Sequence, residues 1–202
     1  MICMTSSTRQ SSTRELSGVK IKGQSILAFV RALTELQGPD SVDRIRPLIL
    51  PEVAQSLAQK EVLSVGWYPI EWFSSLHNAA QSVFGPGISR NISRTATRHD
   101  VTTIYRFILK FISPDTVVKQ YARLFAMFCE TGRVVVEENR KGFAQLKLSG
   151  LAGASQGVWE DVIGTTEVVL ELCGAKSATG RLVAGGTDYS GVATVALMWT
   201  AG

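Results

Sequence analysis

HDVTTIYRFILKFISPDTVVKQYARLFAMFCETG, residues 99–132, is the stretch on which the predicted fold depends. Apolar side chains recur at helical spacing in both of its halves, so it predicts two helices with heavy apolar faces. Ser113 and Pro114 mark the corner, because proline suits the first turn of a helix and the serine before it can cap the free amides. Gly132 is expected to end the second helix. This much apolar surface needs covering, so we expect the helix pair to be central.

Length and composition indicate an ordinary globular protein. The chain has 202 residues, of which 45% are hydrophobic and 19% charged. We expect residues 1–16, rich in Ser, Thr and Arg, to form a disordered tail, and residues 17–202 to form a single domain. The net charge of +4 and the pI of about 9.1 are weaker than the basic footprint of a nucleic-acid binder, so no nucleic-acid partner is expected.

Cysteine content and hydropathy indicate the cellular compartment. Cys3, Cys129 and Cys173 are few, odd in number and far apart, and no histidine lies at metal-ligand spacing from them. A disulfide framework or a metal site is therefore not expected, and a reducing compartment fits better. The sequence shows no signal peptide and no run that would span a membrane, so the expected location is cytoplasmic.

The periodicity of the apolar residues changes along the chain. A helical period dominates the middle, and a period of two appears after Gly132. We expect an α+β fold in which central helices pack on one antiparallel sheet of about four to five strands. The expected strands are residues 17–23, 133–137, 142–148, 179–184 and 192–199, and the expected helices include 24–36, 42–48, 70–84, 88–98 and 158–172.

Three arginines form a basic stripe on the predicted helix 88–98. Arg90, Arg94 and Arg98 are four residues apart and therefore lie on one helix face. Such spacing is typical of a solvated face, and it also fits a surface that grips a phosphate or an acidic protein partner. We take this stripe as the candidate interaction surface. If the side chains are solvated, Arg90→Glu combined with Arg94→Glu should leave folding intact.

Aromatic residues around the predicted helices are the candidate ligand site. Small-molecule sites are mostly apolar and aromatic, so these side chains are expected to line or shape a pocket between the helices and the sheet. The alternative is that they fill a core. The eight residues are Trp67, Tyr68, Trp72, Phe73, Phe107, Phe111, Tyr121 and Phe125.

Other chemical groups have a structural and a functional interpretation. His99 could be an axial ligand or a proton shuttle, or merely a residue at a helix junction. Cys129 and Cys173 could be modified or redox-active thiols, although packing as small buried hydrophobes is the simpler interpretation. The glycine-rich stretch 185–191 lacks the spacing of a phosphate loop and predicts a hairpin turn. The sequence contains no paired-carboxylate motif, and we expect no catalytic residues, no metal and no cofactor.

A set of short motifs resembles a known family. These motifs are GWYP at 66–69, TTIYR at 102–106, SP at 113–114, TGR at 131–133 and a last strand that ends in Trp199. Together they resemble a paralogous family of myxobacterial proteins of similar length and unknown function. That family is similar in turn to vinyl-4-reductase-type small-molecule-binding domains, and more distantly to transport-particle subunits and haem nitric-oxide-binding domains. The resemblance covers residues 17–200 and implies an α+β ligand-binding architecture around an apolar pocket.

The sequence also departs from these relatives. Residues 181–199 lack the cysteine pair common in vinyl-4-reductase-type domains. The haem-binding relatives hold their cofactor with an axial histidine and a Tyr-x-Ser-x-Arg motif, and this motif does not occur in the chain. The resemblance therefore implies neither a metal–thiol role nor haem. We expect a non-enzymatic domain that binds or senses an apolar small molecule in a regulatory role. The alternative is a protein-interaction module that acts as a homodimer or as an adaptor in a regulatory complex.

Overall fold

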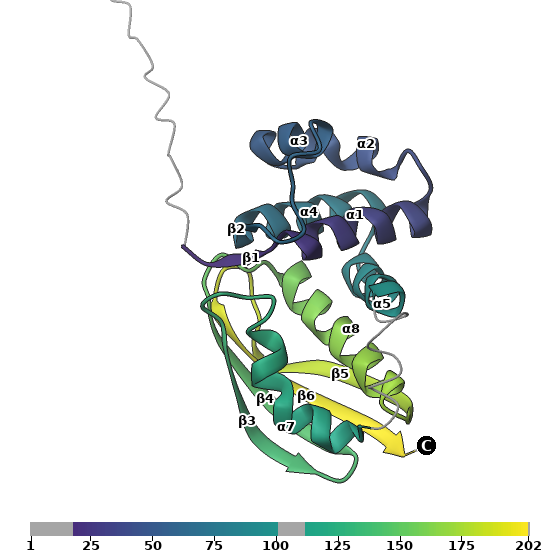
Figure 1. Ribbon diagram of the computed structural model, residues 1–202, viewed down its shortest axis with the longest axis vertical. Coiled ribbons are helices and arrows are strands. Elements are labelled where there is room, and N and C mark those ends of the chain that lie inside the picture. Colours follow the sequence, from purple (N-terminus) through teal and green to yellow (C-terminus); the bar gives the residue numbers. More distant parts are fainter. Residues whose placement is uncertain (1–17, 101–111, 202) are drawn as a thin grey trace, which may run out of the picture.

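Two structurally different halves make up the molecule (Figure 1). The computed structural model describes residues 18–100 and 112–201. Helices from the first half of the chain form a layer at one end, and an antiparallel sheet with helices against it forms the other. The expected α+β class is thus confirmed. The predicted tail and the first helix of the stretch 99–132 lie outside the described residues.

Prolines and glycines in the sequence set where the helices of the helical layer begin and end. Pro47 and Pro51 both stand in the first turn of a helix, where a missing amide hydrogen costs nothing. The expected helix 70–84 is confirmed at both ends, and Gly85 follows it with a φ of 88°. The layer consists of α1 (Gly23–Gln37), α2 (Ser41–Ile45), the short 3₁₀ helix η1 (Arg46–Leu48), α3 (Pro51–Ala58) and α4 (Ile70–Phe84).

The N-terminal strand does not join the main sheet. Strand β1 (Lys20–Lys22) pairs antiparallel with β2 (Trp67–Pro69), and the two form a separate ribbon. The other side of β1 is also occupied, because Ile21 bridges to Cys129 and the Lys22 amide donates to the Phe128 carbonyl at 3.0 Å. With both edges in use, β1 has no free edge to offer the sheet.

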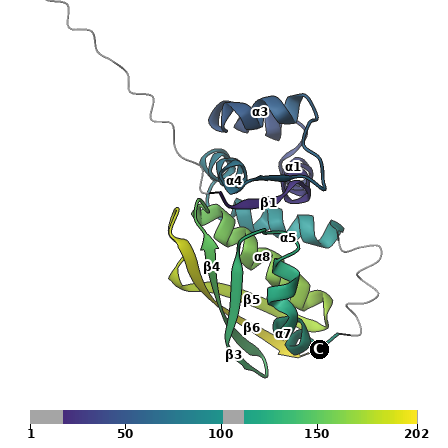
Figure 2. The ribbon, with the colours of Figure 1, turned by 60° about the vertical axis from the view of Figure 1, so that its left-hand side comes forward.

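The sheet in the second half has four antiparallel strands in the order β3-β4-β6-β5. The expected hairpin after Gly132 is confirmed and is longer than expected, with its turn at Lys141-Gly142. Helices α7 and α8 cover one face of this sheet (Figure 2). The elements are β3 (Arg133–Arg140), β4 (Phe143–Leu151), α8 (Gln156–Leu172), β5 (Ala175–Gly185) and β6 (Gly191–Ala201).

Helix α8 is more deeply buried than the described part of the stretch 99–132. Helix α7 (Pro114–Phe125) begins as expected, with the Ser113 hydroxyl accepting from the Thr116 amide at 3.3 Å. However, α7 ends at Phe125 and not near Gly132, because the next residues turn to meet β1. Phe128 from its expected apolar face is 44% exposed. In α8, by contrast, Trp159 is fully buried.

Helix α5 (Ile88–Asp100) joins the two halves. It lies between α1 in the helical layer and α8 on the sheet (Figure 1). Its buried residues include Ile88 and Ile92, which belong to the same apolar core as the helical layer and the sheet. At its end, Asp100 forms an ion pair with Arg31 of α1. We call the interface between α5 and α8 the seam.

Candidate functional site

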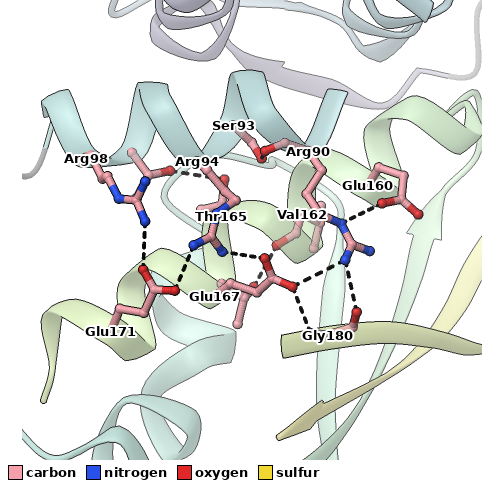
Figure 3. A network of polar contacts seen from close by, with 12 residues as sticks. Arg90, Ser93, Arg94, Arg98, Glu160, Val162, Thr165, Glu167, Glu171 and Gly180 are labelled. Atoms are coloured by element: carbon pink, nitrogen blue, oxygen red, sulfur yellow. Dashed lines mark hydrogen bonds and ion pairs between the residues drawn. The ribbon is translucent and has the colours of Figure 1, made fainter. Parts of the chain in front are cut away.

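A ladder of alternating charges runs along the seam (Figure 3). Three arginines of α5 face three glutamates of α8, and each central member contacts two partners. Read along the seam, the order is Glu160, Arg90, Glu167, Arg94, Glu171, Arg98, with N···O distances of 2.7, 3.3, 2.5, 2.7 and 2.9 Å between successive members. Equal numbers of positive and negative charges make the ladder neutral.

Glu167 is the most enclosed member of the ladder. Its side chain is 5% exposed, and its carboxylate accepts from Arg90, from Arg94 and from the Gly180 amide at 2.8 Å. Arg90 in turn donates to the Gly180 carbonyl at 3.2 Å. A buried carboxylate needs such compensation, because its desolvation is otherwise unfavourable. Glu167 therefore ties α5, α8 and β5 together at one point.

The sequence of α5 explains the ladder's regularity. Residues 88–99 repeat a four-residue unit three times: ISRN, ISRT and ATRH. Residues four apart lie in one row on a helix, so the unit creates an apolar row, a row of small hydroxyl residues and a row of arginines. On α8, the glutamates at positions 160, 167 and 171 share one face because seven and eleven residues are close to whole turns.

Small residues let the two helices approach closely. A Cβ atom on Gly164 of α8 would collide with the Ser93 hydroxyl and would lie 2.8 Å from the Arg90 carbonyl. One turn further on, the Thr97 hydroxyl donates to the Thr165 hydroxyl at 3.3 Å. The short separation brings the charged side chains within hydrogen-bonding distance of one another.

Ionisation at the open end of the ladder follows from these contacts. Burial acts to raise the pKa of Glu171, but hydrogen bonds and charges from Arg94 and Arg98 outweigh it and lower that pKa below its usual value. Burial acts to lower the pKa of Arg94, and Glu171 with Glu167 reverses this, so that the pKa of Arg94 is raised. Each group thus favours the charged form of its neighbour.

A polar groove opens at the other end of the ladder. Its volume is about 760 Å³, and it lies between α4, the turn before α5 and the first turns of α8. Arg90 and Glu160, which form the first rung of the ladder, stand in its wall. Amide and hydroxyl side chains supply most of the remaining lining: Asn78, Gln81, Ser82 and Gln156, with Pro86 and Gly87.

The first rung leaves two polar atoms uncommitted. Nε of Arg90 donates to Oε2 of Glu160, and Nη1 of Arg90 donates to Glu167 and Gly180. Among the described residues, neither Nη2 of Arg90 nor Oε1 of Glu160 makes a hydrogen bond, as Figure 3 also shows. The groove therefore offers a donor and an acceptor of opposite charge side by side.

The arginine stripe is thus not the solvated face expected from sequence. Arg90 and Arg94 point into the seam and are 30% and 22% exposed, because α8 supplies a glutamate to each. Arg98, at 55% exposed, is the most accessible of the three. Sequence reasoning identified the arginines and missed their partners. The signal was present in the glutamate spacing of 158–172, a segment interpreted only by its apolar side.

The structure separates the aromatic residues expected to line a pocket. Trp67, Tyr68 and Trp72 lie at the β1–β2 ribbon and the start of α4, where the Tyr68 and Trp72 rings are 5.3 Å apart. Phe73 packs in the core against Phe29. The remaining described members lie on α7, and Phe107 and Phe111 lie outside the described residues.

The α7 aromatics form a second cluster. The Tyr121 and Phe125 rings stack at 6.3 Å, and the buried Tyr121 hydroxyl lies 2.5 Å from the Thr166 hydroxyl. Burial raises the pKa of Tyr121 to about 12. Neither this cluster nor the ribbon cluster lines the polar groove or a second groove of about 520 Å³ beside Cys173. The six described aromatic residues do not converge on one cavity.

The cysteines and histidines occupy contrasting environments. Burial raises the pKa of Cys129, and it raises the pKa of Cys173 to about 11, so both favour the unreactive thiol form. His99 is 58% exposed beside Asp100 at the end of α5. His77 is completely buried, with Phe29 and Phe73 ring centroids 4.8 and 4.4 Å from its own and an Asp161 oxygen at 3.5 Å.

Residues 18–100 and 112–201 contain neither a cluster of metal-ligating side chains nor a helix that could span a membrane. No three side chains of the His, Cys, Asp or Glu type gather there as a metal site would require. No helix in these ranges is long and apolar enough to cross a bilayer.

Comparison of the chain with known proteins gives a structural match only. No family model matches the sequence, and no curated protein matches it significantly. Among solved structures, the Fe(II) unliganded H-NOX protein from K. algicida is 16% identical, with a TM-score of 0.65 over 90% of this chain and 98% of that one. The chain has the fold of an H-NOX domain.

Other solved H-NOX structures also match the fold of this chain. An oxygen-binding H-NOX domain related to soluble guanylate cyclases, solved as its oxygen complex, is 10% identical with a TM-score of 0.59, over 89% of this chain and 95% of that one. A T. tengcongensis H-NOX variant is 12% identical with a TM-score of 0.56, over 89% and 97%. At this level of identity the likeness establishes the H-NOX-like fold alone. The myxobacterial family suggested by the short motifs has no support from these comparisons.

The described residues of this chain do not form a site that fits the haem of the H-NOX structures. Haem iron is held in proteins by residues such as His, Cys or Tyr that face the porphyrin. The chain has two histidines, and neither lines the groove beside Arg90 or the groove beside Cys173. The His77 ring is enclosed by phenylalanines, the two described cysteines favour the thiol, and Tyr121 is committed to Thr166. The seam and its polar groove are therefore the better candidate site.

Proposed function

We propose that this chain is a non-enzymatic regulatory domain that binds a small molecule in the polar groove at the end of the seam. The observation that carries the proposal is the double role of Arg90 and Glu160. They line the groove, and they also form the first rung of the ladder that ties the helical layer to the sheet. A ligand in the groove would act directly on the contact between the two halves.

The dimensions and chemistry of the groove support this role. Ligand sites usually measure about 300–1,000 Å³, and the groove falls in this range. Its amide side chains each offer two donors and an acceptor, which suits a ligand rich in hydrogen-bonding groups. The proposal replaces the apolar ligand expected from sequence with a polar one, because the described aromatic residues are divided between the core, the ribbon and α7.

A ligand in the groove could change the equilibrium between conformations of the protein. A ligand shifts a conformational equilibrium only by its difference in affinity for the two states. A ligand that contacts both Arg90 of α5 and Glu160 of α8 senses the placement of one helix against the other. Its binding energy would therefore depend on the geometry of the seam.

An NMR screen tests the proposal. Isotope-labelled protein is titrated with small-molecule fractions of a cell extract, and chemical-shift changes are mapped on the structure. We expect changes at Gly87, Gln156 and their neighbours in the groove. Gln156→Ala combined with Gln81→Ala should weaken them, whereas Gln59→Ala on the exposed end of α3 should not. Shift changes confined to other surfaces, or absent with every fraction, would contradict the proposal.

One observation favours a protein-interaction module as the second candidate function. At the ribbon, Lys22 contacts three residues that have exposed apolar side chains: its ammonium lies 3.9 Å from the Trp67 ring and donates to the backbone carbonyl of Val65, and its amide donates to the backbone carbonyl of Phe128. Val65 is 76% and Phe128 44% exposed, and exposed apolar groups of this kind mark interaction surfaces. Light scattering should show a dimer that Val65→Asp converts to a monomer. A parent protein that is monomeric at all concentrations would exclude the homodimer.

A further inference from the structure

The groove's charges define a class of ligand. We infer that it takes a zwitterion of the α-amino acid type, with the ligand carboxylate on Arg90 and the ligand ammonium on Glu160. This inference rests on the proposed function and adds the chemistry of recognition. It depends on one juxtaposition: Nη2 of Arg90 and Oε1 of Glu160, both unused by the described chain, belong to side chains joined at 2.7 Å through their other atoms.

The ion pair holds both groups in place for a ligand. Arg90 is fixed by acceptors on three sides, namely Glu160, Glu167 and the Gly180 carbonyl. Because its remaining N–H groups lie in the same plane, they have a defined direction before any ligand arrives, and preorganised donors bind with a smaller entropic cost. Glu160 is likewise held by one oxygen and has the other available.

Charge balance favours a zwitterion over a simple ion. The first rung is neutral, so an anion on Arg90 would be repelled by the Glu160 carboxylate beside it, and a cation on Glu160 would be repelled by Arg90. A molecule with both charges on neighbouring groups satisfies both side chains and keeps the rung intact. An α-amino acid carries its ammonium and carboxylate on one carbon atom, which matches two adjacent protein groups.

The rest of the lining suits the remainder of such a ligand. Primary amides at Asn78, Gln81 and Gln156 offer both donors and acceptors, so polar side chains or a peptide bond can be paired. A volume of about 760 Å³ exceeds what one amino acid fills, so a short peptide has room as well. Free amino acids and short peptides share the zwitterionic chemistry, and the probes below distinguish them.

The experiment compares four probes by NMR titration of the intact protein. L-glutamine and glycyl-glycine carry both charges, N-acetyl-L-glutamine lacks the ammonium, and L-glutamine amide lacks the carboxylate. We expect shifts at the groove with at least one zwitterion, and binding weaker by about tenfold or more when either charge is removed, as expected for the loss of one charge-assisted contact. L-glutamine binding more tightly than glycyl-glycine would identify a free amino acid as the ligand type, and the reverse would identify a peptide.

Variants locate the effect. Glu160→Gln removes the proposed ammonium partner and should reduce zwitterion binding without weakening the residual binding of N-acetyl-L-glutamine, which has no ammonium. Arg90→Lys keeps the charge beside Glu167 and removes the second donor edge, so it tests the carboxylate partner if larger changes prevent folding. Glu35→Gln makes the same chemical change on an exposed face of α1 and should alter nothing.

Failure of the inference is distinguishable from failure of the proposed function. If N-acetyl-L-glutamine or L-glutamine amide bound the groove as tightly as L-glutamine, the zwitterion inference would be wrong while the groove remained a ligand site. If none of the four probes shifted groove resonances but an extract fraction did, the same conclusion would hold. If neither probes nor extract fractions acted there, both proposals would fall.

Discussion

Helix α8 packs in two different ways on its two sides. Toward the sheet it presents apolar side chains such as Trp159 and Ile163, which are fully buried in the shared core. Toward α5 it presents Glu160, Glu167 and Glu171, each paired with arginine. The apolar side gains free energy from buried area, and the charged side gains specificity because each charge requires its partner. On the charged side, Nη2 of Arg90 and Oε1 of Glu160 make no hydrogen bond to the described residues and are available to a ligand.

The largest effect should come from the apolar side. Trp159→Ala removes a fully buried indole and should cost about 3–5 kcal/mol of unfolding free energy, measured by urea denaturation. Trp67→Ala removes the same group from the ribbon, where Trp67 is 36% exposed, and should cost clearly less. Equal costs would mean that α8 is not the core helix.

Glu167→Ala should have the next largest effect. Its removal leaves Arg90, Arg94 and the Gly180 amide without their shared acceptor, and breaking a buried pair in this way costs about 3 kcal/mol or more. Glu167→Gln should cost less, because an amide oxygen can still accept from Gly180. If both variants had the same urea midpoint as the parent, the contacts of Glu167 would not stabilise the fold.

Adding a side chain where α5 and α8 approach closely should destabilise the protein less than the loss of Glu167. Gly164→Ala places a methyl group against Ser93 and the Arg90 carbonyl, and should cost about 1–3 kcal/mol even though alanine is the better helix former. Adding Ser93→Gly should recover part of the loss, and a double-mutant cycle measures that coupling. A stabilising Gly164→Ala change would show that the helices are further apart.

The smallest effect is a dependence on pH. The pKa of Glu171 is lower in the folded than in the unfolded protein, so its contribution is complete above the ordinary carboxyl value of 4.5 and is lost as the pH falls through the lowered value. In this range the unfolded chain binds more protons than the folded protein, so the free energy of unfolding decreases as the pH is lowered. Urea midpoints measured from pH 7 downward should fall less steeply for Glu171→Gln. Parallel curves for the two proteins would contradict the assignment.

Local sequence patterns predicted the elements well. The hairpin after Gly132, the helix 70–84 and the Ser113 cap all follow from turn residues and periodicity, which act within a few residues. The pairing of β1 with β2 was missed because it joins segments more than forty residues apart, and three residues carry too little pattern to show it.

Only the arginines of the candidate site were recognised from the sequence. The arginine row of α5 was recognised, but its burial depends on α8, which lies about seventy residues further along the chain. A helix with a charged face looks the same in sequence whether water or an oppositely charged helix covers that face. The four-residue repeat in 88–99 and the matching glutamates in 160–171 were the available signal, and only their comparison would have revealed the ladder. The aromatic residues misled because they also serve as ordinary core.

Charge reversal on α5 tests the central claim most directly. Arg90→Glu combined with Arg94→Glu turns four attractive contacts of the ladder into repulsive ones. Lys119→Glu combined with Arg123→Glu makes the same change in charge at the same spacing on the exposed face of α7. We predict that the α5 variant unfolds at a much lower urea concentration than the parent, or does not fold, while the α7 variant stays close to the parent. Similar stability of the two variants would show that the arginines of α5 are solvated and that the seam is not held by this ladder.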